Sequence, residues 1–297
     1  MMSGDTNLKG YVDLHCHGGG GFYFSDPNPE NIERVITFHK SNGSANLLAS
    51  LVSETISDLK NQIIRLIPFC KDGSISGIHL EGPYLAKARC GAHNPDLLKA
   101  PTIDEVKELM EVSDGHIKMI TIAPELNNAL EVIRYLSNNQ VIAAIGHTNG
   151  SYEDALKAVD AGASLVTHFS NGMNKLKDGD KTFAAALLYE SEVPLEIIFD
   201  GHHVSTQDLE TISEIAPNRI VLVTDAMSAS GMPDGHYQIS SMDVVVKEGV
   251  ARLASNGALA GSTLTMNLAV ANAREFGLSN ELVLNSSQTL PLSLLKL

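Results

Sequence analysis

The chain has 297 residues, of which 43% are hydrophobic and 19% are charged. A chain of this length and composition can bury a large core, as one large domain or two small ones. The formal net charge of −14 argues against nucleic acid or an anionic membrane surface as a partner. An anionic small-molecule substrate remains compatible with this charge if cationic side chains gather locally.

Targeting and redox features point to the cytoplasm. No apolar run approaches the roughly 20 residues that a bilayer span needs. The N-terminus, MMSGDTNLKG, has neither the basic region nor the apolar core of a secretory signal. The three cysteines, Cys16, Cys70 and Cys90, include no CxxC pair, so a disulfide framework is not expected. We therefore expect a cytoplasmic protein that does not bind membranes.

Short β-rich runs alternate with helical patterns along the chain. Eight runs are predicted strands: 10–18, 44–53, 75–82, 116–125, 140–148, 163–171, 195–204 and 219–227. Several intervening helices open with a Ser, Thr or Asn cap followed by acidic residues, which suits the helix dipole. Eight strands with eight following helices predict an α/β fold of the (β/α)₈ TIM-type barrel class. A doubly wound open sheet is the alternative.

The domain organisation follows from this count. We expect a single domain over residues 1–297, with its barrel strands within about 10–227. An inserted hairpin is predicted at about 236–260, and the last helix at about 263–277.

Histidines and carboxylates recur where the predicted strands end. In a strand, His15 and His17 point to the same face, and catalytic groups of barrels lie at the carboxyl ends of the strands. A single buried histidine is usually a satisfied core residue. A cluster without a compensating cation would leave costly polar groups, so the whole set favours a metal ion. The strand-end residues are His15, His17, Glu81, His147, His168, His202, His203 and Asp225.

Two metal sites are conceivable within this set. Glu81, His147 and His168 form a two-histidine, one-carboxylate group that is common for catalytic zinc or iron. His15 and His17 are candidates for a second ion, with Asp225 as a further ligand and Glu81 as a bridge. We expect one or two divalent ions per chain, zinc first, with iron and manganese as alternatives. A bound ion makes hydroxide accessible at neutral pH, and Asp225 is then the candidate to move the proton.

Seven segments of the chain carry a recognisable pattern when taken together in this order: VDLHCHGGGG, GIHLEGPYL with GAHNP, AIGHTNGSYEDALKAVDAGA, LVTHFSNGM, FDGHHV, LVTDAMSASG and LAGSTLTM. With these segments the sequence closely resembles the N-acetylglucosamine-6-phosphate deacetylase family of the amidohydrolase superfamily. The resemblance implies metal-dependent hydrolysis of the N-acetyl group of N-acetylglucosamine 6-phosphate, which gives glucosamine 6-phosphate and acetate.

The resemblance also assigns roles to individual residues. It implies a main metal site at Glu81, His147 and His168, a general acid/base at Asp225, and a second ion at the histidine pair after strand 1. It implies that His93 stabilises charge on the acetyl oxygen and that His203 contacts the sugar. Asn171 and Gly172 match a pair that meets the phosphate, although Asn-Gly by itself reads as a tight turn.

Two departures from the family pattern qualify these expectations. The family usually carries an arginine after the strand-6 histidine that reaches the partner subunit's phosphate; Gly179 stands there, with Lys177 or Lys181 as substitutes. Lysine cannot make the planar bidentate contact. The family's small β-sandwich domain is also expected to be largely missing, with the ending LPLSLLKL as a short helix over part of the barrel surface.

Several alternatives stay open at this point. We expect a homodimer that acts on a small amino-sugar phosphate. The alternative functions are deacylation of another N-acyl amino sugar or N-acyl amino acid, and a catalytically silent barrel that binds a sugar phosphate.

Overall fold

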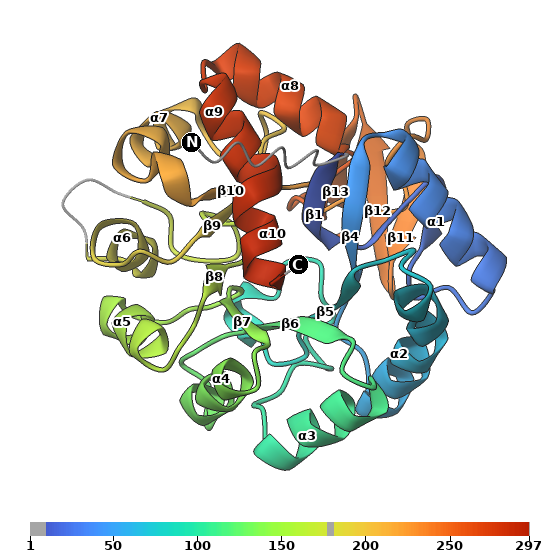
Figure 1. Ribbon diagram of the computed structural model, residues 1–297, viewed down its shortest axis with the longest axis horizontal. Coiled ribbons are helices and arrows are strands. Elements are labelled where there is room, and N and C mark those ends of the chain that lie inside the picture. The colour runs from blue at the N-terminus through green and yellow to red at the C-terminus, as the bar shows by residue number, and fades with distance from the viewer. Residues whose placement is uncertain (1–9, 177–180, 297) are drawn as a thin grey trace, which may run out of the picture.

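The computed structural model describes residues 10–176 and 181–296, and its largest sheet has eight parallel strands (Figure 1). Neighbours in this sheet are also neighbours in chain order, which is the arrangement of a (β/α)₈ barrel rather than of a doubly wound sheet. The strands are β1 (Tyr11–Cys16), β4 (Ser44–Leu51), β5 (Gly77–Glu81), β6 (Ile117–Ile122), β7 (Ile142–Ile145), β8 (Leu165–Val166), β9 (Leu195–Ile198) and β10 (Ile220–Val223).

The first and last strands meet through an irregular seam that closes the sheet. The backbone N–H of Asp225 donates to the carbonyl of His15 at 2.8 Å, and a bridge joins Cys16 to Ala226. Further down, the Asp13 carboxylate replaces a backbone acceptor, because it accepts from the Thr224 N–H at 3.2 Å. The barrel therefore closes with polar side chains in the joint between β1 and β10.

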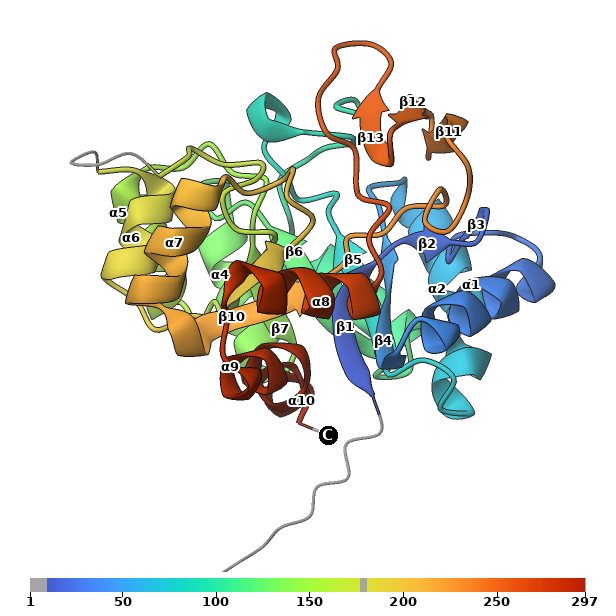
Figure 2. The same ribbon diagram turned by 90° about the horizontal axis from the view of Figure 1, so that it is seen from above.

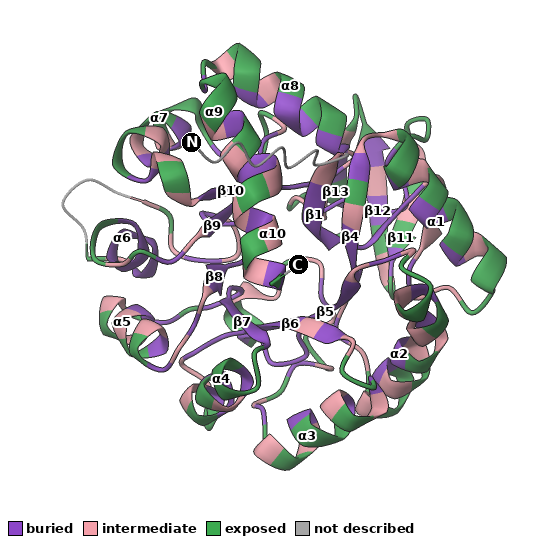
Figure 3. Cartoon of the chain, viewed as in Figure 1, coloured by how far each residue is buried: buried purple, intermediate pink, exposed green. Residues whose placement is uncertain are grey.

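Helices surround the barrel, and most have a buried stripe toward the strands and an exposed outer face (Figure 3); the helix over Phe183–Tyr189 is buried except at Tyr189. Five of them begin at a Ser or Thr whose side chain accepts from the backbone N–H three residues on, at Thr55, Thr102, Ser151, Thr182 and Ser205. The helices are α1 (Pro29–Ser41), α2 (Ile56–Lys71), α3 (Ile103–Val112), α4 (Ala129–Asn138), α5 (Tyr152–Asp160), α6 (Phe183–Tyr189), α7 (Thr206–Ile215) and α8 (Met266–Phe276). Two 3₁₀ turns, η1 (Lys87–Arg89) and η2 (Pro217–Arg219), lie in the connections.

The predicted barrel class is confirmed, but the observed strands are shorter than the predicted runs. The carboxyl ends of the predicted runs are loops in which the backbone leaves the extended region. His147, His168 and Asp225 have φ values of 47°, 26° and 49°, which a ladder strand does not adopt. His147, His168 and Asp225 therefore belong to the loops that follow the strands, whereas His15 and Glu81 lie inside β1 and β5.

The region of the predicted hairpin holds three antiparallel strands instead of two. They are β11 (Gly235–Ile239), β12 (Met242–Lys247) and β13 (Val250–Leu253). A two-stranded ribbon of β2 (Gly18–Gly19) and β3 (Phe22–Tyr23) follows β1. In Figure 2 the three-stranded sheet stands above the carboxyl ends of the barrel strands.

The C-terminal segment lies at the opposite end of the barrel (Figures 1 and 2). It runs through α9 (Asn280–Leu284), a π-helical turn η3 (Asn285–Thr289) and α10 (Leu290–Leu295). Leucines of α10 pack into one apolar cluster with barrel-strand residues such as Met119 and Leu165. The expected terminal helix is present, and it covers the end of the barrel where the strands begin.

The barrel and the two small sheets are the sheets found in residues 10–176 and 181–296, so a β-sandwich domain is not among the described elements. No helix in these ranges has the length and apolar character needed to cross a bilayer.

A matched pair of substitutions tests the barrel core. Leu165 is fully buried, whereas Leu268 on α8 is 52% exposed. Leu165→Ala should lower the free energy of unfolding by about 2–5 kcal/mol because it leaves a cavity, and Leu268→Ala should change it by less than about 0.5 kcal/mol. Chemical denaturation measures both. Equal losses would contradict the assignment of Leu165 to the core.

Candidate metal centre

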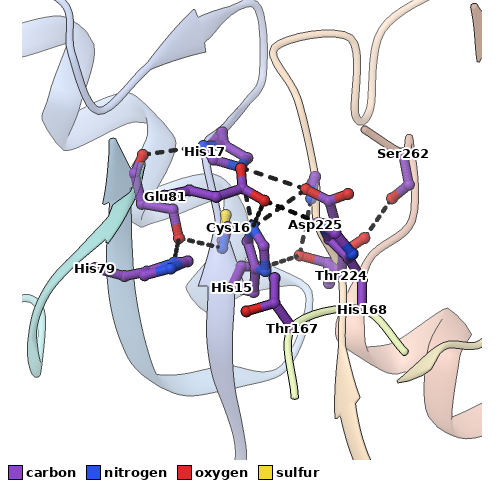
Figure 4. Close-up of polar contacts among 12 residues, drawn as sticks. His15, Cys16, His17, His79, Glu81, Thr167, His168, Thr224, Asp225 and Ser262 are labelled. Atoms are coloured by element: carbon purple, nitrogen blue, oxygen red, sulfur yellow. Dashed lines mark hydrogen bonds and ion pairs between the residues drawn. The ribbon is translucent and has the colours of Figure 1, made fainter. Parts of the chain in front are cut away.

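Side chains from β1 and the residue after it, from β5 and from the loops after β7, β8 and β10 converge at the carboxyl end of the barrel. Figure 4 shows five of them: His15, His17, Glu81, His168 and Asp225. All of them are buried, with at most 8% of their surface exposed. The converging residues are those predicted as metal ligands or proton carrier: His15, His17, Glu81, His147, His168 and Asp225.

Glu81 is the centre of this group. Its Oε1 lies 3.1 Å from His147 Nε2 and 3.0 Å from His168 Nε2. Its Oε2 lies 3.1 Å from His17 Nε2 and 3.2 Å from His93 Nε2. One carboxylate therefore spans the two halves of the cluster, as expected for a bridging ligand.

The β1 pair faces Asp225 across the barrel seam. His15 Nε2 lies 3.1 Å from His17 Nε2, and Asp225 Oδ1 lies 3.5 Å from the first and 3.4 Å from the second. The seam contact between Asp225 N–H and the His15 carbonyl holds these groups in register. Closure of the barrel thus sets the spacing of this half of the site.

The neighbouring histidines keep the carboxyl groups of Glu81 and Asp225 ionised. Burial alone would raise the pKa of Asp225, but His15 and His17 lower this pKa to about 2. Burial opposes ionisation of Glu81 as well, yet the charge of His15 and hydrogen bonds from His147 and His15 hold its pKa well below the ordinary value. Burial lowers the pKa of His17, but its hydrogen bonds with Asp225 and Glu81 raise it to about 9. The site therefore presents anionic oxygens that would attract a cation.

Hydrogen bonds at Nδ1 orient the candidate ligand imidazoles. His147 Nδ1 donates to the Arg89 carbonyl at 2.8 Å, and His17 Nδ1 donates to the Ser50 carbonyl at 3.2 Å. A proton on Nδ1 leaves the Nε2 lone pair free to coordinate. In both residues Nε2 is the atom that points at Glu81.

His93 has the opposite arrangement. The backbone N–H of Ser53 donates to His93 Nδ1 at 3.3 Å, so Nδ1 accepts and the proton resides on Nε2. Burial lowers the pKa of His93, which favours this neutral form. Although His93 lies within ligand distance of Glu81 and His147, it is suited to donate a hydrogen bond rather than to coordinate.

The donor set fits a divalent metal ion. Two pairs of Nε2 atoms, His15 with His17 and His147 with His168, are 3.1 Å apart, and in each pair both ring nitrogens also face a Glu81 oxygen. Two Nε2–H groups directed at each other would repel. Lone pairs directed at a common ion would not, and imidazole with carboxylate suits zinc, iron or manganese.

Close backbone approach fixes the His147 ring. A Cβ on Gly91 would lie 3.0 Å from its Cε1, and a Cβ on Gly172 would lie 3.2 Å from its Nδ1. Both glycines also have positive φ, at 56° and 62°, so larger residues are disfavoured there. Gly172, predicted to meet the phosphate, thus has a packing role against the candidate ligand.

A cavity of about 270 Å³ opens beside the cluster. Four predicted substrate residues line it: His93, Asn171, Gly172 and His203. The three-stranded sheet and the loop after it contribute Ile239, Ala258 and Leu259 on another wall. His203 is held by Asp200, whose Oδ2 accepts from Nδ1 at 2.7 Å, while His202 is exposed and does not line the cavity.

The lysine predictions have separate outcomes. Gly179 and Lys177 lie outside the described residues. The ammonium of Lys181 lies 5.6 Å from the centre of the Tyr152 ring, a cation–π arrangement on α5, and Lys181 does not line the cavity.

Sequence reasoning missed one buried carboxylate of the site, Glu196. Its Oε2 accepts from His15 Nδ1 and from the backbone N–H of His168, each at 3.1 Å. A charged residue inside the apolar run LEIIF was the available signal. By contrast, His79, which had no predicted role, lies one layer deeper and is satisfied by Ser50 and Thr121 hydroxyls at 2.9 and 2.8 Å.

Glu81→Gln tests the shared carboxylate. Because one side chain faces four imidazoles, we expect loss of metal binding in both halves of the cluster. Metal content after dialysis, measured by elemental analysis, would report this, with exposed Glu131→Gln on α4 as the matched control. Wild-type metal content in Glu81→Gln would rule Glu81 out as a ligand.

Comparison with known proteins gives relatives over most of the chain. No protein-family model matches it. An N-acetylgalactosamine-6-phosphate deacetylase of Escherichia coli O157:H7 is 36% identical over 269 residues, which cover 89% of this chain and 71% of the relative. An N-acetylglucosamine-6-phosphate deacetylase of Vibrio furnissii is 32% identical, covering 89% of this chain and 67% of the relative.

Solved structures similar to this chain are deacetylases of the same kind. The N-acetyl-D-glucosamine-6-phosphate deacetylase of Mycobacterium smegmatis, in complex with N-acetyl-D-glucosamine-6-phosphate, has a TM-score of 0.93 and 39% identity, covering 97% of this chain and 77% of that one. The enzyme of Thermotoga maritima has a TM-score of 0.89 and 32% identity, covering 97% and 78%. On this similarity of sequence, fold and extent, the chain belongs to the N-acetylglucosamine-6-phosphate deacetylase family.

Proposed function

We propose that this chain is a metal-dependent hydrolase that converts N-acetylglucosamine 6-phosphate into glucosamine 6-phosphate and acetate. The observation that carries the proposal is the convergence of buried imidazoles and two ionised carboxylates beside a cavity at the carboxyl end of the barrel. Family membership supports the reaction and the substrate.

In this proposal Glu81, His147 and His168 hold the main ion. A divalent ion in such a site polarises a carbonyl oxygen and lowers the pKa of a bound water toward neutrality. The hydrogen bond from His147 to the Arg89 carbonyl and the glycines against its ring keep this ligand in one orientation. Zinc is the ion we expect first.

Asp225 and His93 flank the reacting amide in the proposed mechanism. Asp225, ionised at neutral pH, accepts the proton of the attacking water and returns it to the amine that leaves. His93 donates its Nε2–H to the acetyl oxygen, where negative charge develops. Both side chains line the cavity, so each reaches a substrate placed there.

The sugar phosphate lies along the far wall in this proposal. His203, fixed by Asp200, contacts the sugar, and Asn171 with Gly172 provides donors for the phosphate. No Lys or Arg among the described residues lines the cavity. The contribution of the 6-phosphate to substrate binding is therefore measured directly, by comparing phosphorylated with unphosphorylated sugar. We propose a homodimer in which a partner subunit completes this end.

Acetate release tests the function. The purified protein should release acetate from N-acetylglucosamine 6-phosphate, lose this activity with chelator and regain it with added metal. Unphosphorylated N-acetylglucosamine should react with a lower kcat/KM. Absence of acetate release from any N-acetylated amino sugar, with metal bound, would favour the binding-only alternative.

N-acetylgalactosamine 6-phosphate is the second candidate substrate, because the E. coli O157:H7 relative named for that substrate is 36% identical to this chain. The two sugars differ only in the configuration at C4. Comparison of kcat/KM for the two phosphates in the same assay decides between them, and a clear preference for the galactose epimer would replace our first assignment.

Asp225→Asn tests the proton carrier. The amide cannot accept the proton, so kcat should fall by about 10²–10⁴-fold, while the ion at Glu81, His147 and His168 stays bound. Turnover and elemental analysis are measured together, with exposed Asp160→Asn on α5 as the control. Unchanged turnover would remove Asp225 from the mechanism.

A further inference from the structure

Three apolar side chains from separate segments line one side of the cavity. Val52 follows β4, Ala92 lies in the loop after β5, and Ile239 is the last residue of β11. Ile239 is 4% exposed and belongs to the apolar cluster that the three-stranded sheet forms with the loop after β10. Val52 and Ala92 pack against the same cluster. These three residues, the apolar wall, therefore belong to one packed unit that joins the barrel rim to the small sheet.

Hydrogen bonds on both sides of Ile239 fix its position at the cavity. The Tyr23 hydroxyl donates to the carbonyl of Gln238, and the Ser240 hydroxyl donates to Glu54 Oε1 at 2.6 Å. Tyr23 lies in β3 and Glu54 lies after β4, so both anchors come from segments that follow barrel strands. Because the residues before and after it are held in this way, Ile239 meets the cavity at a defined place.

The apolar wall flanks the histidine that we assign to the acyl oxygen. His93 Nδ1 accepts from the N–H of Ser53, which is the residue after Val52, and Ala92 precedes His93 in the chain. In the proposed mechanism the Nε2–H of His93 meets the acetyl oxygen. The methyl group is bonded to the same carbon as that oxygen, which brings it to the side of the cavity lined by Val52 and Ala92.

The lining on the sugar side has a different chemistry. Asn171, Gly172 and His203 offer amide, backbone and imidazole groups, which suit hydroxyl and phosphate groups. The side chains of the apolar wall contain no hydrogen-bonding atom, so a hydroxyl placed against them would lose the partners that it has in water. The cavity is thus suited to hold an N-acyl sugar in one orientation, with the acyl group on the apolar wall.

We propose that Ile239 is a specificity-determining residue that sets the length of the acyl group this enzyme removes. Val52 and Ala92 form the side of the acyl pocket, and Ile239 forms its end. The proposal rests on the proposed function and adds its acyl specificity, which is for short apolar N-acyl groups with acetyl first. A longer chain would meet the Ile239 side chain, which the two hydrogen-bonded neighbours keep in place.

A series of acyl lengths in Ile239→Ala tests the proposal. With the full chain loaded with Zn²⁺, kcat/KM is measured for N-acetyl-, N-propionyl- and N-butyrylglucosamine 6-phosphate. In the wild-type protein the first added methylene should lower kcat/KM by about 10–200-fold, as in other apolar pockets. Ile239→Ala opens the end of the pocket, so the ratio of propionyl to acetyl should rise by about 10-fold or more. Ile64→Ala on α2, where Ile64 is 53% exposed, is the matched control and should leave the ratio unchanged.

The ratio separates a pocket from a general structural effect. A ratio within one variant does not depend on the fraction of protein that is folded, and looser packing of the small sheet would change both values by the same factor. Ile239→Val should shift the ratio in the same direction by a smaller factor, and it serves where Ile239→Ala does not fold. The preference between N-acetylglucosamine and N-acetylgalactosamine 6-phosphates should stay as in the wild type, because the sugar lies on the other side of the cavity.

Two results would overturn the proposal. They are equal kcat/KM for the acetyl and butyryl substrates in the wild-type protein, and a wild-type ratio of propionyl to acetyl in the folded Ile239 variants. Release of no carboxylate from any of these sugars would instead contradict the deacetylase assignment. The acyl pocket is then tested by calorimetry, where the dissociation constants of the same three sugars should show the wild-type order and its relaxation in Ile239→Ala.

Discussion

Glu81 places a negative charge in a buried cleft whose neighbouring side chains are imidazoles. His147 and His168 lie on one of its oxygens and His17 and His93 on the other. A carboxylate in this position needs positive charge nearby, and a divalent ion supplies it while also using the converging nitrogen lone pairs. The imidazoles of the cluster are arranged to share this ion, because each candidate ligand is oriented toward Glu81 or toward the neighbouring Asp225.

The topology of the barrel brings the candidate ligands together around Glu81. Parallel strands in chain order bring residues about 200 positions apart in the sequence to one rim, and the seam between β1 and β10 joins His15 directly to Asp225. Backbone turns with positive φ at His147, His168 and Asp225 direct side chains over the rim. Such conformations are costly and persist where the surrounding structure imposes them. The strand ladders below act on all three residues, and Gly91 and Gly172 also pack against the His147 ring.

Much of this architecture could be predicted from the sequence, because buried parallel strands and capped helices leave strong local patterns. Each predicted barrel strand has an observed counterpart, and His15, His17, His147 and His168 converge as expected, whereas His202 is exposed. The third strand of the 235–253 sheet was missed, since turns between short strands carry weak signals. The role of Glu196 and the position of the ring proton on His93 could not be predicted either, because both depend on contacts between distant segments. Glu196 Oε2 contacts His15, and His93 Nδ1 accepts from the Ser53 N–H.

The most direct test of the account is the position of metal in crystals of the protein, located by anomalous scattering at the absorption edge of the bound element. We predict a peak within coordination distance of Glu81, His147 and His168, on the side of the Nε2 atoms. A fully loaded crystal that showed no peak among these three side chains, or a peak only elsewhere on the protein, would contradict the account.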